Sequence, residues 1–508
     1  MKKLIGILIL GSHILMAQNS FDYTVDLTTN TDTFAVSLTI PGKLGKSENL
    51  FQFPSTAPGT YQTQNIGRFV SDFKVYNAKG KELKTTFIAP NQYIISKSHK
   101  AEKVTYKVAE TFDTRVTEYP VYMMCGSSLE RDHALINAHT IMGYVKGHQG
   151  SPYSVRLIGN ENWTTGTALS SENGLFKAES FDHLVDSPIL TGEHITTAQT
   201  EVSGTPIRLF CYSEKGQLTA EPILENMEEM LHASQKFLVK LPVDQYTFLY
   251  YFMQNPDGVT GAWEHSYSSE YVLGEGNPTE EFMDQVTDIA SHEFFHIVTP
   301  LNIHSEIIEE FNFVEPTPSE HLWLYEGVTE WASNILLMRG GVTSLDEYLQ
   351  GSVIQKILVN DVYFDKSWSL ARIAEESFNS EGAKQYGNIY YKGSLTAGYL
   401  DIRLLELSNG QRGLREVMLE LVKKYGKGNP FNEKTFFADL TAMTYPEIGD
   451  FIERYIKNAE ELPHEEYLNK IGLNYARDGR KIKITKMPNP TDTQKMLLEV
   501  WQKNMPLE

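Results

Sequence analysis

The hydrophobic pattern of this chain changes its period once, and that change limits the folds available to it. From Phe21 to about Ile207, short stretches such as FDYTVDLTT and KVTYKVAE alternate apolar and polar residues. Alternation with a period of two, broken by Gly, Asn and Pro, is typical of strands in an all-β sandwich. After Pro278 the pattern is mostly helical, to about Asn458. The chain is therefore predicted to be an α+β multidomain protein.

These patterns divide the chain into successive regions. We predict an N-terminal β-sandwich at residues 18–207, a mixed domain at 208–340, an α-helical domain at 341–470 and a short tail at 471–508. In the mixed region, LENMEEMLHASQKFLV is predicted to be helical, and DQYTFLYYFM and EHSYSSEYVL are predicted strands. The tail offers one strand-like run and one short helix.

The first twenty residues, MKKLIGILILGSHILMAQNS, have the layout of a secretory signal peptide. Two lysines precede an apolar run from Leu4 to Met16, which is short for a membrane span, and the small residue Ala17 follows it. An uncleaved membrane anchor is the alternative. We expect residues 1–17 to be removed and the mature chain to be exported, to the periplasm or the medium, without a membrane span.

Charge and cysteine content exclude several classes of function. The chain has 45 Lys and Arg against 65 Asp and Glu, a formal net charge of −20. Such a surface argues against nucleic acid or an anionic membrane as a partner. Cys125 and Cys211 are the only cysteines, so a cysteine-based zinc site is excluded. Whether these two form a disulfide is left open by the sequence.

The segment PTEEFMDQVTDIASHEFFHIVTP predicts a helix that can bind a metal. Thr279 can cap its start, and Pro300 ends it. His292 and His296 then lie one turn apart on one face, so both imidazoles can reach one ion. Glu293 lies beside them, where it can accept a proton from a bound water. The motif alone can also arise by chance, so a third ligand has to be found.

Spacing restricts the third ligand. The arrangement of metzincins is excluded, because Asn302 stands where their third histidine would be. We interpret His304 as a loop residue. Glu315 precedes a proline, which disfavours a helix there. The segment SEHLWLYEGVTEWASNILLMRGG is predicted to be a helix that runs from a Ser319 cap to Gly340-Gly341. Glu326 is the better candidate, because it shares a face of this helix with Glu330. One of the two glutamates can then bind the metal while the other orients a ligating histidine.

HEFFH, EGVTEW and YYKGSL together resemble the glycyl aminopeptidase family of zinc metallopeptidases, in the thermolysin-like group. That family places 29 residues between the second histidine and the ligand glutamate, and residues 297–325 provide this spacing, which favours Glu326. The resemblance extends over most of residues 21–470, including the Pro-Gly-x-Tyr turn in APGTYQ. It implies a thermolysin-like catalytic domain at 208–340 and one Zn²⁺ per chain, bound by His292, His296 and Glu326.

Two further motifs acquire roles through this resemblance. GAWEH at 261–265 is similar to the family's edge strand beside the cleft, so Gly261 and Ala262 are expected to pair with substrate backbone and Glu264 to hold its amino terminus. Tyr390 matches the tyrosine that donates to the tetrahedral oxyanion. Trp263 and Ala262 depart from the family's Leu and Gly. No Gly-Leu-Gly-Phe-like loop follows Leu473, so we do not expect the family's usual C-terminal PDZ domain in these residues.

The sequence as a whole predicts an exported zinc aminopeptidase that acts on peptides with a free N-terminus, with Glu293 as the general base and Glu330 supporting a ligand. The family name implies small first residues, Gly or Ala. A zinc endopeptidase with the same core is the closest alternative, and a catalytically inactive peptide-binding protein is the alternative from another class. No oligomeric state is indicated.

Overall fold

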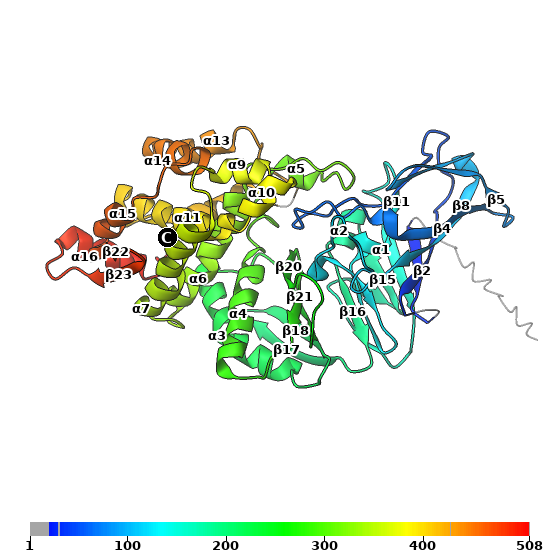
Figure 1. Cartoon of the computed structure of the whole chain (residues 1–508), viewed down its shortest axis with the longest axis horizontal. Helices are drawn as coiled ribbons and strands as arrows, with labels where there is room; N and C mark the ends of the chain where they lie inside the picture. The colour runs from blue at the N-terminus through cyan, green and yellow to red at the C-terminus, as the bar shows by residue number, and fades with distance from the viewer. Residues whose placement is uncertain (1–19, 29–30, 427, 507–508) are drawn as a thin grey trace, which may run out of the picture.

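The computed structural model describes residues 20–28, 31–426 and 428–506. The predicted signal peptide at residues 1–17 lies outside these residues. A β-rich N-terminal region forms one end of the molecule, a sheet with helices the middle, and helices with the C-terminus the other end (Figure 1). This arrangement confirms the α+β multidomain fold class.

The N-terminal region contains three sheets rather than two. Its largest sheet has eight strands, and two four-stranded sheets accompany it. The eight strands, in order across the sheet, are β14 (Ser170–Glu172), β15 (Leu175–Ala178), β12 (Tyr153–Ile158), β1 (Phe21–Asp26), β2 (Thr33–Thr39), β8 (Ala101–Ala109), β4 (Val70–Asn77) and β5 (Glu82–Leu83). The first of the smaller sheets has the strand order β13 (Thr164–Gly166), β16 (Ile189–Gly192), β10 (His133–Ile136), β9 (Ser128–Leu129). The second has the order β11 (Tyr144–Val145), β3 (Leu50–Gln52), β7 (Gln92–Ile95), β6 (Thr85–Ala89).

A five-stranded sheet forms the middle of the molecule, in the order β17 (Thr196–Val202), β18 (Thr205–Ser213), β19 (Tyr246–Met253), β21 (Ser268–Gly274), β20 (Gly261–His265). The boundary predicted at residue 207 falls inside β18. This strand pairs in parallel with β19, so the second region begins before β17. The predicted strand EHSYSSEYVL contains the end of β20 and most of β21, which form an antiparallel pair.

The central strand β19 fixes this sheet between the helices and the N-terminal region. Its sequence, YTFLYYFM, is apolar at nearly every position because both faces are buried. Phe248 and Phe252 pack into the core shared with the helices, whereas Leu249 and Tyr251 pack against Leu190 of the N-terminal region. The two regions therefore share a buried interface.

Helices α3 (Ala220–Leu238), α4 (Glu280–Phe295) and α6 (Thr329–Gly340) pack on one another beside this sheet. Thr279 caps α4 as predicted, since its side chain accepts from the Phe282 amide. The helix ends at Phe295 rather than just before Pro300, because the amides of Ile297 and Val298 bond to carbonyls three residues back and tighten the last turn.

The segment predicted to start at a Ser319 cap begins instead at Leu322 and has π-helical geometry over Trp323–Val328 before it continues as α6. Ser319 is held in a loop, where its hydroxyl donates to Glu433. Gly341 ends α6 in the left-handed conformation, at φ 82°, close to the predicted stop.

Helices make up the C-terminal third. The chain passes through α7 (Leu345–Glu347), a π-helical turn (Tyr348–Ile354), α8 (Gln355–Tyr363), α9 (Leu370–Glu375), α10 (Ser380–Gln385), α11 (Asn388–Leu407), α12 (Leu414–Lys424), α13 (Phe436–Met443), α14 (Pro446–Ile452) and α15 (His464–Lys470). The tail differs from the prediction of one strand. It forms a hairpin of β22 (Leu473–Asp478) and β23 (Lys481–Lys486), followed by α16 (Asp492–Trp501), whose Trp501 is buried.

The structure also shows the state of the two cysteines, which the sequence left open. Cys125 and Cys211 are both buried as free thiols, so they are not paired. No helix among the described residues is long and apolar enough to cross a membrane.

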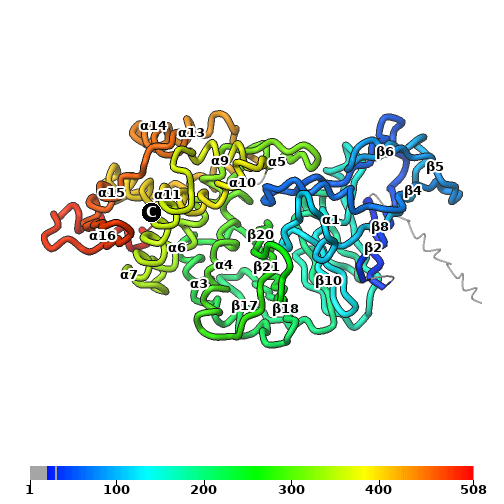
Figure 2. Tube along the Cα trace, in the orientation of Figure 1, coloured from blue at the N-terminus to red at the C-terminus, as the bar shows by residue number. Residues whose placement is uncertain are grey.

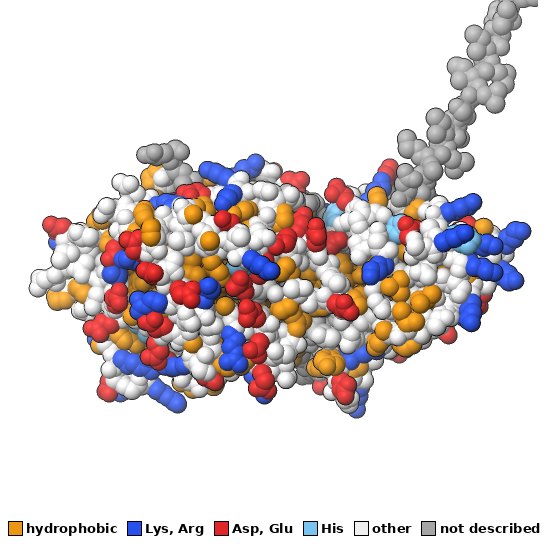
Figure 3. Space-filling view, turned by 90° about the horizontal axis from the view of Figure 1, so that it is seen from above, with side chains coloured by type: hydrophobic (Ala, Val, Ile, Leu, Met, Phe, Trp, Pro, Cys, Tyr) orange, Lys and Arg blue, Asp and Glu red, His pale blue; other side chains and the backbone are white. Residues whose placement is uncertain are grey.

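The surface charge is uneven. Basic side chains gather at the end of the molecule formed by β4, β5 and β8 (Figure 3). The exposed lysines of this part of the chain are Lys74, Lys79, Lys81, Lys84, Lys97, Lys100, Lys103 and Lys107. The net charge of −20 therefore describes the whole molecule and not this end.

A pair of glycines sets the distance between the π-helical segment and α11. A Cβ placed on Gly327 would lie 2.9 Å from the backbone of Gly393, so a side chain there would push the two elements apart. We expect Gly327→Ala to lower the free energy of unfolding by about 1–3 kcal/mol, measured by denaturant unfolding. Gly351→Ala is the matched control. Its site is helical with open space, so it should be neutral or stabilising by up to about 1 kcal/mol. Equal stability of Gly327→Ala and the wild type would contradict this packing argument.

Candidate metal centre

Three predicted ligands converge between α4 and the π-helical segment. The His292 and His296 ring centroids lie 4.9 Å apart. Glu326 Oε2 lies 3.4 Å from His292 Nε2 and 3.5 Å from His296 Nε2. One ligand atom from each of the three residues lies within 4.8 Å of the others, and all three side chains are buried.

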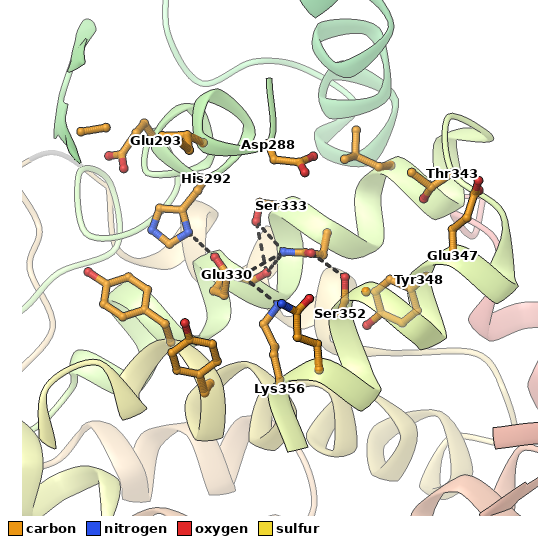
Figure 4. A pocket seen from close by; sticks show the side chains of 18 residues that line it. Asp288, His292, Glu293, Glu330, Ser333, Thr343, Glu347, Tyr348, Ser352 and Lys356 are labelled. Atoms are coloured by element: carbon orange, nitrogen blue, oxygen red, sulfur yellow. Dashed lines mark hydrogen bonds and ion pairs between the residues drawn. The ribbon is translucent and has the colours of Figure 1, made fainter. Parts of the chain in front are cut away.

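The other nitrogen of each histidine is already engaged. His292 Nδ1 donates to Glu330 Oε2 at 2.7 Å, and His296 Nδ1 donates to the Thr299 carbonyl at 2.9 Å. Figure 4 shows Glu330 beside the His292 ring. Nδ1 of each imidazole is therefore protonated, and Nε2, which faces Glu326, is the atom left to bind a metal. Two imidazoles and one carboxylate, each imidazole fixed through its outer nitrogen, are a donor set that fits catalytic zinc.

The protonation of the two histidines differs. Burial lowers the pKa of His296 to about 4, so this imidazole is neutral at physiological pH. Burial opposes protonation of His292 as well, but the carboxylates of Glu326 and Glu330 outweigh it and raise the pKa of His292. A metal ion that binds here therefore displaces a proton from His292.

Two more carboxylates approach this cluster. Glu264, Glu293 and His296 also offer atoms within 4.8 Å of one another. Burial raises the pKa of Glu293 to about 8, with a further contribution from Glu326, so Glu293 can exchange a proton near neutral pH. Burial and the carboxylates of Glu326 and Glu293 raise the pKa of Glu264. A cationic group placed among these carboxylates would relieve their repulsion.

Tyr390, on α11, lies on the open side of the ligand cluster. Its ring centroid is 5.5 Å from that of His292, and its hydroxyl is 3.4 Å from that of Tyr386. Burial raises the pKa of Tyr390, as does Glu326, so the phenol remains protonated and can donate. The ring of Tyr391 packs 5.8 Å from that of Phe364, and Tyr391 lines the same cavity as Tyr390.

The strand β20 passes between two cavities. It is the last strand of its sheet, paired only with β21, and Gly261 and Ala262 are half-buried. Ala262, His292, Glu293 and Tyr390 line a cavity of about 660 Å³, the one drawn in Figure 4. Glu264 lines a second cavity of about 480 Å³.

The second cavity includes residues that the sequence did not place at the site. In Figure 2 a blue segment of the N-terminal region reaches towards β20 and α10. A Cβ on Gly59 would lie 2.6 Å from Glu264 Oε1, and Tyr61, at φ 44°, packs its ring 5.3 Å from Tyr386. The Trp263 indole donates to the Pro58 carbonyl at 3.2 Å. The Pro-Gly-x-Tyr motif was the signal in the sequence that this turn has a special role, but the sequence alone does not show that the turn lies against Glu264.

The alternative ligands lie apart from this cluster. His304 Nε2 bonds to Glu309 at 2.6 Å, and its Nδ1 bonds to the Pro300 carbonyl at 2.6 Å. Glu315 is exposed in a loop. Neither belongs to the group of His292, His296 and Glu326.

Comparison with known proteins identifies the family. Residues 22–193 match the model of the Peptidase M61 N-terminal domain, and residues 285–396 match that of the M61 glycyl aminopeptidase. Together the two matches cover more than half of the chain. The chain belongs to the M61 glycyl aminopeptidase family. It is a zinc metallopeptidase of the aminopeptidase type. The second match contains His292, Glu293, His296, Glu326 and Tyr390, whereas Glu264 lies outside both matched ranges.

Solved structures show a similar fold. A member of the aminopeptidase N family from Idiomarina loihiensis aligns with a TM-score of 0.77 at 20% identity, over 90% of this chain and 79% of its own. The M1 zinc metallopeptidase from Deinococcus radiodurans aligns with a TM-score of 0.53 at 12% identity, over 87% of this chain and 94% of its own. Among curated proteins, no sequence match was found.

We expect His296→Ala to lose bound zinc, because it removes an Nε2 donor that lies 3.5 Å from Glu326 Oε2. Elemental analysis of purified protein should fall from about one zinc per chain to near zero. His304→Ala is the matched control, a buried histidine outside the cluster, and should keep its zinc. Equal zinc content in the two variants would exclude His296 as a ligand.

Proposed function

We propose that this chain is an exported aminopeptidase that uses one zinc ion to remove the first residue of peptides with a free amino terminus. One observation carries the proposal. The carboxylates of Glu264 and Glu293 lie within 4.8 Å of each other and of His296, so a substrate amine bound by Glu264 is held at a short, fixed distance from the base and the metal ligands. Such an arrangement selects the first peptide bond.

Substrate recognition follows from charge and from the free edge of β20. A peptide α-amine has a pKa of about 7.7–8.0, so it is largely cationic at neutral pH. It offsets the repulsion that Glu264 experiences from Glu293 and Glu326. The substrate backbone can pair with Gly261 and Ala262, since β20 has a strand on one side only. The first side chain then faces the cavity beside Glu264, and the following residues extend into the cavity of about 660 Å³.

The residues around the cluster divide the chemistry between them. His292, His296 and Glu326 would hold the zinc ion, which when bound would supply a Lewis acid and lower the pKa of a water molecule to about 7. Glu293 accepts a proton from the attacking water and passes it to the nitrogen of the departing peptide. The Tyr390 hydroxyl donates to the substrate oxygen on which negative charge develops. Glu330 keeps the His292 ring oriented by accepting from its Nδ1.

Export and the choice of first residue belong to the same proposal. The proposal of export to the periplasm or the medium rests on the signal-peptide layout of MKKLIGILILGSHILMAQNS. A preference for Gly or Ala is supported by the family's name. Trp263 and Tyr61 line the cavity that receives this residue, so they are the side chains that set its limits.

Blocking the substrate's amino end tests the exopeptidase function. We expect a free Gly or Ala peptide to be cleaved and its N-acetylated form to be resistant, measured by release of the first residue. Glu264→Gln should lower kcat/KM for the free peptide by about 10–100-fold, because a charged hydrogen bond contributes about 1.5–3 kcal/mol. Equal cleavage of free and acetylated peptides would favour the endopeptidase alternative.

A second variant separates catalysis from peptide binding. Glu293→Gln keeps the shape of the site and removes the base, so turnover should disappear in the same assay while zinc stays bound. A wild-type chain that binds the peptide without cleaving it would support the inactive binding protein. Turnover that survives in Glu293→Gln would assign hydrolysis to another group.

Adjacent tyrosines provide a matched pair for the oxyanion donor. Tyr390→Phe removes the hydroxyl beside His292 and should lower kcat by about 10²–10³ with little change in KM. Tyr391→Phe removes a hydroxyl from a side chain that lines the same cavity but packs its ring on Phe364 instead of His292, and should lower kcat far less. The measurement is steady-state kinetics of both variants on the same peptide. An equal loss of kcat in the two variants would contradict the assignment of Tyr390 as the oxyanion donor.

A further inference from the structure

The carboxylate of Glu330 is held from two sides. Its Oε2 accepts from His292 Nδ1 at 2.7 Å, and its Oε1 lies 2.8 Å from Nζ of Lys356. Figure 4 shows the three side chains in a row beside the large cavity. The row joins α4, α6 and α8, so a residue 64 positions after His292 fixes the group that orients it.

Lys356 is a buried cation with a single partner. Its side chain is 8% exposed, so its ammonium group has lost most of its contact with water. A buried charge is stable only when it is paired. Among the residues that the structure describes, Glu330 alone forms an ion pair with Lys356. The stretch SVIQKILV around it is apolar on both sides, which was the signal in the sequence that this lysine is not an ordinary surface residue.

A second contact fixes the same oxygen. Asn334 Nδ2 lies 3.2 Å from Glu330 Oε1, and the Ser352 hydroxyl donates to Asn334 Oδ1 at 2.6 Å. Asn334 lies on α6 together with Glu330, whereas Ser352 and Lys356 follow α7. The part of the chain after α7 therefore holds the Glu330 carboxylate directly through Lys356 and indirectly through Ser352, which fixes Asn334.

The two ligating histidines are supported differently. His296 donates to a backbone carbonyl only three residues away, whose position follows from the local turn. His292 donates to a flexible side chain that has to be held by other residues. Removal of the ammonium group would leave Glu330 without its strongest partner and free to turn away from His292.

We propose that Lys356 is a positioning residue for the metal site: through Glu330 it fixes the His292 ring so that Nε2 points towards His296 and Glu326. The inference rests on the proposed zinc site. Outer partners of metal-ligating histidines typically change metal affinity by about 10–100-fold. Lys356 does not contact the metal in this scheme, and although it lines the cavity of about 660 Å³, its effect is expected in metal affinity first.

Zinc affinity, measured by competition with a chromogenic chelator, tests the role of Lys356. We expect Lys356→Met to bind zinc about 10–100-fold more weakly than the wild type. Lys470→Met is the matched control, because Lys470 forms an ion pair with Glu406 at the same 2.8 Å but far from the ligands. It should bind zinc within about twofold of the wild type. Should Lys356→Met fail to fold, Lys356→Gln replaces it under the same criteria.

A double-mutant cycle shows whether Lys356 acts through Glu330. In a Glu330→Gln background, adding Lys356→Met should weaken zinc binding by no more than about twofold, because the intermediary is already lost. A Lys356→Met protein with wild-type zinc affinity, or fully additive losses in the double variant, would overturn the proposal. A wild-type chain that binds zinc but cleaves no peptide would contradict the proposed function and leave this inference standing.

Discussion

The structure depends on the burial of several carboxylates in one place. Four glutamates converge on His292 of α4 and on His296, which follows its last residue. They come from the sheet edge, from α4, from the π-helical segment and from α6: Glu264, Glu293, Glu326 and Glu330. Charges of one sign cannot be buried together without counterions. Lys356 neutralises one of them. His292, whose pKa is raised beside Glu326 and Glu330, offsets a second one, and burial raises the pKa of Glu264 and of Glu293 so that their protonated forms are favoured. A divalent metal and, in the proposed function, a substrate ammonium group would add further positive charge at this place.

The fold forms this cluster by packing elements that are distant in sequence closely together at glycines. Gly327 and Gly393 let the segment with Glu326 approach the helix with Tyr390. The π-helical geometry at Trp323–Val328 occurs at the position of the ligand glutamate, as such turns often do at functional sites. The five-stranded sheet then holds β20 beside α4, because both faces of β19 are buried in large apolar cores.

Local patterns in the sequence predicted most of the cluster, and long-range contacts account for what they missed. Helical spacing placed His292, Glu293 and His296 together, and the resemblance to the glycyl aminopeptidases, with its interval of 29 residues, favoured Glu326 as the third ligand. The spacing of four residues also predicted Glu330 as the partner of a histidine. Lys356 and Tyr61 were missed, since their positions depend on how α8 and the N-terminal region dock. Long-range contacts also account for what the sequence missed in the fold. The alternating pattern predicted β-strands up to about residue 207, but it did not predict that β17 and β18 belong to the same sheet as β19 in the next region.

The turn that contains Gly59 and Tyr61 brings the N-terminal region to the cavity beside Glu264. The three residues that group around the metal position all lie after residue 291, whereas one wall of the cavity beside Glu264 comes from the first hundred residues. Part of this wall is thus supplied by a stretch of chain far in sequence from the residues around the metal position, although Pro300 and Leu301 line the cavity as well. Under the proposed function, grafting a different turn between Ser55 and Gln64 would reshape the cavity beside Glu264 and leave His292, His296 and Glu326 in place.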